Sequence, residues 1–126
     1  MTQEITDLVE QASEHLRQNY KQYQHHVASA LKCNDKVYLS LHLDTKGFDI
    51  CAEPIALSNA LANGETEFKY IVAVIMKKDG LTEIVSPCGN CRQMLLQYCP
   101  QVEVILNADD RIATVAASKL LPWPYN

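Results

Sequence analysis

The sequence predicts an α/β fold in which helices cover both faces of a mixed five-stranded sheet, giving three layers in the order α/β/α. Apolar patterns of helical and strand period follow one another as α, β, β, α, β, α, β, with short connections. The run YIVAVIM at residues 70–76 is almost continuously apolar, which is typical of a strand covered on both faces. At 126 residues, 48% of them hydrophobic, the chain fits a single domain over residues 1–126.

The first half of the chain predicts a helix, a hairpin and a second helix. Apolar residues recur at helical spacing over residues 3–18. Two strand-like runs, 26–31 and 36–43, flank the turn residues Asn34 and Asp35 and indicate a β-hairpin. Residues 51–62 are rich in alanine and leucine and are followed by Asn-Gly, a common helix stop, so they predict a helix that begins at Cys51.

The second half predicts three strands and one helix. After the strand at 70–76, a short strand is expected at residues 82–85. Pro87 and Gly89 interrupt the chain just before a helix at 91–97, which Pro100 ends. Residues 102–106 predict the fifth strand. A turn at 108–110 and a tail containing Leu-Leu-Pro, Trp123 and Tyr125 complete the chain.

Charge and cysteine content exclude several classes of function. The formal charge of −4 lacks the basic surface that non-specific nucleic-acid binding requires, so a small molecule is the expected partner. The N-terminus has no basic segment followed by an apolar one, and no stretch approaches the ~20 apolar residues of a membrane span. Five cysteines, an odd number, argue against a disulfide framework. We therefore expect a cytoplasmic protein with reduced thiols and no membrane partner.

Three of the cysteines have the spacing of metal ligands. Cys88 and Cys91 form a C-x-x-C pair, and Cys51 begins a predicted helix with Glu53 two positions later. A structural zinc site would require a fourth protein ligand, and the sequence offers none at suitable spacing. Three thiolates would leave one position of a Zn²⁺ ion open, which is typical of catalytic zinc. Cys33 has the features of a small core residue and Cys99 those of a helix-end residue.

Arg92 follows the last of these cysteines directly. Three thiolates on one dication carry a net charge of −1, which predicts a need for compensating donors. The expected donors are Arg92 and the N-termini of the two helices that begin at the cysteines. The alternative for Arg92 is a salt bridge on the surface or between subunits.

The sequence CAE at 51–53, PCGNCRQ at 87–93 and the LLP near the C-terminus together resemble the cytidine deaminase family, in particular its small homotetrameric members. The layout is more similar still to the blasticidin S deaminases, which share a VASA strand and a tyrosine three residues after LLP. The likeness extends from about residue 26 onward. It implies a cytidine deaminase-like fold, a homotetramer with a homodimer as the alternative, and hydrolytic deamination of a cytidine-like nucleoside, base or modified aminopyrimidine.

Carried over by position, the resemblance makes Cys51, Cys88 and Cys91 the zinc ligands and Glu53 the catalytic acid and base. Two departures leave the substrate open. Cytidine deaminases carry a phenylalanine-asparagine-x-glutamate-asparagine stretch before CAE, where residues 39–45 here read LSLHLDT. The basic residue that precedes SPCG in blasticidin S deaminases is replaced by Thr-Glu at 82–83.

Six residues are expected near the substrate on the same grounds. His42 falls where the family asparagine would lie, with Asp44 as a substitute carboxylate if the loop is displaced, and His26 precedes VASA. The remaining candidates are the backbone of Ala52 and the rings of Trp123 and Tyr125. Purely structural roles stay open for the histidines and the aromatic tail. A zinc-containing protein that binds such heterocycles without turnover is the alternative function, and Glu53 favours catalysis over it.

Overall fold

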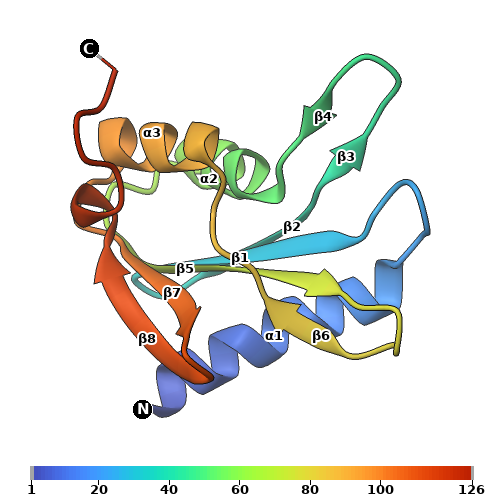
Figure 1. Ribbon diagram of the computed structural model, residues 1–126. Helices are drawn as coiled ribbons and strands as arrows, with labels where there is room; N and C mark the ends of the chain where they lie inside the picture. Colours follow the sequence, from blue (N-terminus) through green and yellow to red (C-terminus); the bar gives the residue numbers. More distant parts are fainter. Residues whose placement is uncertain (1, 126) are drawn as a thin grey trace.

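The computed structural model describes residues 2–125, in which a mixed sheet lies between one helix on one face and two on the other (Figure 1). Helix α1 (Gln3–Asn19) begins where the Thr2 hydroxyl accepts a hydrogen bond from the Ile5 N–H at 3.3 Å. Its buried stripe, Ile5, Leu8, Ala12 and Leu16, packs against strands of the sheet. The helical period of the apolar residues thus becomes the first layer.

The sheet consists of six strands within the described residues, in an order that differs from the order in sequence. The continuous path is β2 (Val37–Leu41), β1 (Val27–Cys33), β5 (Phe68–Met76), β7 (Glu103–Ala108) and β8 (Arg111–Ala116), while β6 (Thr82–Ile84) also pairs with β5. Strands β5 and β7 are parallel and the other pairs are antiparallel. The mixed sheet is confirmed.

Strand β8 is the strand that the five-stranded prediction missed. It returns from β7 through a turn in which Asp109 and Asp110 both have positive φ, 51° and 65°. Such a turn suits a two-residue hairpin, but Asp-Asp without glycine is a weak signal for it. No residue of this edge strand is fully buried and its exposed and half-buried positions do not alternate strictly, so it adds little periodicity. The turn was predicted and the returning strand was not.

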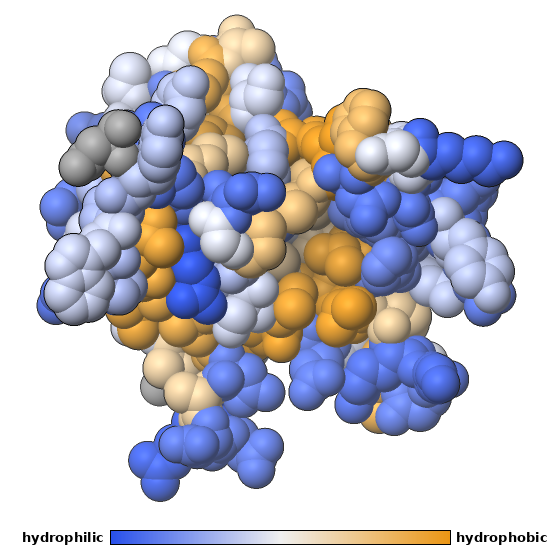
Figure 2. Space-filling model, turned by 45° about the horizontal axis from the view of Figure 1, so that its top comes forward, coloured by the Kyte–Doolittle hydropathy of each residue, from blue (hydrophilic) through white to orange (hydrophobic). Residues whose placement is uncertain are grey.

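Two helices cover the opposite face (Figure 1). Helix α2 (Ala52–Ala62) has Cys51 as its N-cap, and α3 (Gly89–Tyr98) has Cys88. A core that includes Leu31, Leu57, Ile71 and Leu95 fills the space between these helices and the sheet. Figure 2 views the molecule toward this face and shows apolar side chains across its centre, bordered by hydrophilic ones. The three-layer prediction is therefore confirmed.

The chain between β2 and α2 forms a small hairpin of its own. The predicted strand over 36–43 ends at Leu41, and β3 (Leu43–Asp44) then pairs with β4 (Asp49–Ile50) in a separate two-stranded sheet that rises beside α2 (Figure 1). Residues Ala117–Lys119 form the 3-10 helix η1 near the C-terminus. Within residues 2–125, no helix combines the length and apolar character needed to cross a membrane.

Candidate active site

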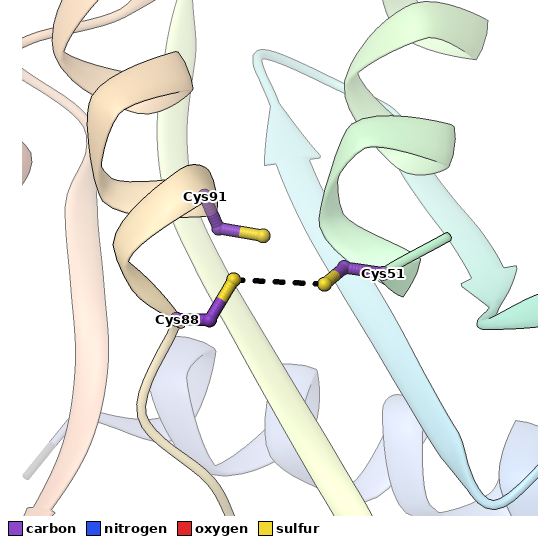
Figure 3. Close-up of side chains that lie close together, drawn as sticks. All are labelled: Cys51, Cys88 and Cys91. Atoms are coloured by element: carbon purple, nitrogen blue, oxygen red, sulfur yellow. Dashed lines mark hydrogen bonds between the residues drawn. The ribbon is translucent and has the colours of Figure 1, made fainter. Parts of the chain in front are cut away.

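The first turns of α2 and α3 bring three thiols to one point. Cys51 precedes α2, Cys88 precedes α3 and Cys91 lies one turn into α3, so the C-x-x-C spacing places both of its sulfurs on one side of that helix. The Sγ atoms of Cys51 and Cys88 are 3.6 Å apart, and all three sulfurs lie within 4.8 Å of one another. Figure 3 shows the three side chains directed into the gap between the two helices.

This geometry fits a tetrahedral metal ion. Zn–S bonds of about 2.3 Å at tetrahedral angles separate two sulfurs by roughly 3.8 Å, close to the distance between Cys51 and Cys88. Thiolates bind Zn²⁺ in preference to Mg²⁺ or Ca²⁺. Cys88 is exposed, Cys51 is half-buried, and Cys91 is buried with 1% of its surface exposed. The open side at Cys88 is where a fourth ligand and a substrate can reach the cluster.

The N-terminus of α3, but not that of α2, lowers the pKa of a thiol as the sequence suggests. Burial alone would raise the pKa of Cys88, but hydrogen bonds from the backbone N–H of Cys91 and from the neighbouring thiols lower it on balance. Burial raises the pKa of Cys51, and the pKa of Cys91 also rises through burial and the nearby Glu53 charge. Cys88, the N-cap of α3, is thus the thiol most ready to ionise.

Glu53 lies in the same place as the thiols. It occupies the first turn of α2, its side chain is 6% exposed, and burial raises its pKa against the opposing effects of its own backbone N–H and the Cys91 thiol. It borders a cavity of about 170 Å³ together with both N-cap cysteines. A buried carboxyl group beside a metal-binding cluster and an open cavity can exchange protons with a ligand held there.

Ala52 is fixed by a bond that sequence reasoning missed. The Ser40 hydroxyl donates to the Ala52 carbonyl at 2.6 Å, joining β2 to the first turn of α2. Ser40 is 4% exposed and its only sequence signal is a small polar residue between two leucines of a strand. The bond sets the backbone of Ala52 at the cavity wall. Val27 and Val85, also unpredicted, form apolar parts of the same wall.

The histidine candidates meet beside this cavity. His42 is 7% exposed and borders it, and the His26 ring lies edge-on to His42 with centroids 4.1 Å apart. Asp44 is exposed on β3, although its carboxylate lies within 4.8 Å of nitrogens of both rings. A hydrogen bond with Asp49 on β4 raises the pKa of Asp44. His42 borders the cavity, whereas His26 and Asp44 lie next to His42 and do not border the cavity.

Arg92 departs from its predicted role. In place of a thiolate, its Nε donates to the Pro87 carbonyl at 2.9 Å and its Nη1 to the Leu120 carbonyl at 3.1 Å. The guanidinium therefore ties the loop that carries Cys88 to the segment after η1. Charge compensation near the thiols comes from backbone N–H groups of α3, and Arg92 contributes by holding the loop.

The aromatic tail also departs from expectation. Trp123 and Tyr125 are 94% and 86% exposed, and neither borders the cavity of its own chain. The Gln93 amide holds the backbone of Tyr125, donating to its carbonyl at 3.0 Å and accepting from its N–H at 3.1 Å. These two backbone bonds place the tail along α3, and both rings are left in solvent.

Comparison with known proteins gives consistent matches along the chain. Residues 2–107 match the family described as the cytidine and deoxycytidylate deaminase zinc-binding region. A blasticidin-S deaminase of Bacillus cereus is 30% identical, covering 99% of this chain and 94% of its own. A cytidine deaminase of Sporosarcina psychrophila is 33% identical, covering 79% of this chain and 74% of its own.

Solved structures agree with these matches. A cytidine deaminase from Burkholderia pseudomallei is 33% identical and superposes with a TM-score of 0.76, covering 99% of this chain and 100% of its own. One from Bacillus anthracis, at 20% identity, has a TM-score of 0.78 over 95% of this chain and 88% of its own, a likeness of fold.

Proposed function

The chain belongs to the cytidine and deoxycytidylate deaminase family, and from that premise we propose that it is a zinc-dependent aminohydrolase. It converts an aminopyrimidine to the corresponding keto compound and releases ammonia. The observation that carries this proposal is the convergence of three thiols beside one buried carboxyl group at the wall of a cavity. A structural metal site would not need that carboxyl group or an open side.

Cys51, Cys88 and Cys91 are the proposed zinc ligands. Their sulfur separations suit tetrahedral coordination with one position left over. A zinc ion bound there supplies an activated water as the nucleophile at neutral pH. The N–H groups at the start of α3 oppose the negative charge of the thiolates and support this ligand set.

Glu53 is the proposed proton carrier. Its carboxylate takes one proton from the attacking water and delivers it to the ring nitrogen beside the reacting carbon, then takes the second proton from the resulting hydroxyl group and delivers it to the leaving amine. The water oxygen bonds to that carbon, the C–N bond breaks, and ammonia departs. The buried position of Glu53 supports this role, because burial raises the pKa of its carboxyl group and so makes the protonated form, which donates, easier to reach.

The substrate is proposed to lie in the cavity bordered by Ala52 and His42, with Val27 and Val85 against the faces of its ring. Cytidine, cytosine and blasticidin S are the first compounds to test, since named relatives comprise both cytidine deaminases and a blasticidin-S deaminase. His26 and Asp44 lie beside the His42 ring and are proposed to hold it in place. Trp123 and Tyr125 stay candidates for contact with a substrate bound by another subunit.

The assembly is proposed to be a homotetramer acting in the cytoplasm, and residues 1–126 one domain. Its support is the family resemblance together with the apolar side chains on the face that carries α2 and α3 (Figure 2). Trp123, Tyr125 and Phe48 are large apolar residues with more than half of their surface exposed. Association of subunits would cover them.

Ammonia release tests the proposal. Zinc-loaded protein is incubated with cytidine, deoxycytidine, cytosine, blasticidin S and other aminopyrimidines, and ammonia is measured against a zinc-free control. The expected result is zinc-dependent release from at least one compound. Tight binding of these compounds by the zinc-loaded protein, without ammonia from any of them, would favour a binding protein instead.

A further inference from the structure

His42 is held rigidly at the end of β2. Its N–H donates to the Val27 carbonyl at 2.9 Å, which continues the ladder between β1 and β2. Its carbonyl lies 3.1 Å from Nδ1 of His25, which donates to it. With the backbone fixed by β1 and by the segment that precedes it, the ring has a defined position at the cavity.

A hydrogen bond selects the tautomer of this ring. The backbone N–H of His26 donates to Nδ1 of His42 at 3.3 Å, and the His26 backbone is itself held by the N–H of Met76 on β5. A nitrogen that accepts a hydrogen bond carries no proton, so the neutral imidazole bears its proton on Nε2. Burial and then the neighbouring His26 lower the pKa of His42, which keeps this ring neutral at pH 7.

The Nε2–H group is free to meet a ligand. Every fully buried side-chain nitrogen or oxygen of residues 2–125 has a partner, whereas Nε2 of His42 has none among those residues. Nε2 is therefore not fully enclosed, and His42 is one of the residues that line the cavity. His42, which is more than nine-tenths buried, thus keeps one unpaired donor at the wall of the cavity.

The same residues do not form a second metal site. His26, His42 and Asp44 have the atom types and proximity for one. However, Nδ1 of His42 already accepts a hydrogen bond and Nε2 is protonated, so neither nitrogen offers a free lone pair. Asp44 in turn is engaged with Asp49. The cluster presents a hydrogen-bond donor and not a cation site.

We propose that His42 determines the substrate class: its Nε2–H donates to an uncharged oxygen acceptor on the N1 substituent of the aminopyrimidine. N1 lies opposite the reacting carbon of the ring, so this substituent extends away from the thiols. None of the residues lining the cavity is Lys or Arg, so nothing in the wall favours a phosphate or carboxylate there. The cavity of about 170 Å³ is small beside the ~300–1,000 Å³ usual for ligand sites, which favours a compact substituent.

This inference rests on the proposed function, and a pair of ligands of matched size separates the two. 1-(2-Methoxyethyl)cytosine carries an ether oxygen where 1-butylcytosine carries a methylene group. Both are titrated calorimetrically into zinc-loaded Glu53→Gln protein. The readout is the dissociation constant of each ligand, which requires no turnover. The expected preference for the ether is several-fold, the size of one net hydrogen bond.

Variants of His42 in the Glu53→Gln background show whether His42 causes the preference for the ether. His42→Leu removes the donor and should abolish or invert the preference for the ether, whereas His42→Gln keeps an N–H near the position of Nε2 and should retain it. His15→Leu, on α1, is the matched control and should keep the starting ratio. The same ratio of dissociation constants in the starting protein and His42→Leu would overturn the proposal.

The tautomer gives a readout independent of both zinc and activity. In ¹⁵N-labelled wild-type protein, correlation spectra of the imidazoles should show His42 protonated at Nε2 and bare at Nδ1. A proton on Nδ1 would overturn the proposal. If wild type released no ammonia from any pyrimidine while the ether preference and the tautomer were both found, the proposed function would fail and the role of His42 would stand.

Discussion

Cys88 is the residue on which access to the metal depends. It is the exposed member of the thiol cluster, and hydrogen bonds from the α3 N-terminus lower its pKa. As the most exposed of the three thiols, it lies at the open side of the cluster. A serine at this position would keep the helix cap but offer an oxygen that stays protonated at neutral pH.

Cys88→Ser should reduce bound zinc from about one ion per chain to a small fraction, because it removes one of three thiolates at a site where residues 2–125 offer no fourth ligand. Metal analysis after dialysis measures the loss. Cys99→Ala, which changes a thiol outside the cluster, is the control and should keep its zinc. Full zinc occupancy in Cys88→Ser would contradict the ligand assignment.

Spacing predicted the residues of the metal cluster but not the direction of every side chain. Local spacing pairs Cys51 with Glu53 at the start of α2 and Cys88 with Cys91 at the start of α3, and the family resemblance assigned both pairs to one site. Arg92 adjoins the cluster in sequence, yet its long side chain reaches two carbonyls, one of them from the distant Leu120. Such contacts depend on tertiary packing, which spacing along the chain does not contain.

At the scale of elements, the site depends on how α2 is attached to the sheet. The bond from Ser40 on β2 to the Ala52 carbonyl is buried and short, and it lies one residue from Cys51 and from Glu53. Ser29 on β1, the cross-strand neighbour of Ser40, makes a comparable buried bond to the Val72 carbonyl at 2.9 Å, and that bond does not reach α2. The two serines allow stability and site geometry to be separated.

Ser40→Ala and Ser29→Ala should each destabilise the fold by about 1 kcal/mol, the usual cost of losing one buried hydrogen bond. Only Ser40→Ala should also lower the rate of ammonia release, since it releases the first turn of α2. Denaturant titration and steady-state rates measure the two effects. Equal rate losses in both variants would mean that the Ser40 bond acts through stability alone.

The order of elements was predictable because the core positions repeat with the period of each element. Residues 70–76 are apolar because β5 is covered on both faces, and the cores on the two sides confirm it. Strand β8 escaped prediction because an edge strand of small residues buries little. The β3–β4 hairpin escaped because two-residue strands have no measurable period.

At the scale of the whole molecule, the core between the sheet and α2 and α3 contains two thiols that do not take part in the metal cluster. Cys33 and Cys99 are buried there, and burial raises the pKa of each to about 11. In the unfolded chain these thiols ionise from their ordinary pKa of 9.0. Folding therefore favours the neutral thiol.

The contribution of these two thiols to the free energy of unfolding should therefore be fully present below pH 9. It should be lost as the pH rises toward 11, because the thiols of the unfolded chain lose their protons first. Urea unfolding between pH 8 and 11 measures this slope. The double variant Cys33→Ala/Cys99→Ala should be less stable at pH 8, owing to lost packing, but should have a shallower slope. An unchanged slope would show that other groups cause the alkaline loss.

The central claim is that a buried carboxyl group beside three thiolates carries protons during hydrolytic deamination. Ammonia release by Glu53→Gln, compared with wild type at equal zinc content and equal folded fraction, tests it most directly. The account predicts that the variant keeps about one zinc per chain and binds substrate, while its rate falls by at least ~10²-fold, the usual contribution of a general acid–base group. Zinc-loaded Glu53→Gln that releases ammonia at the wild-type rate would contradict the account.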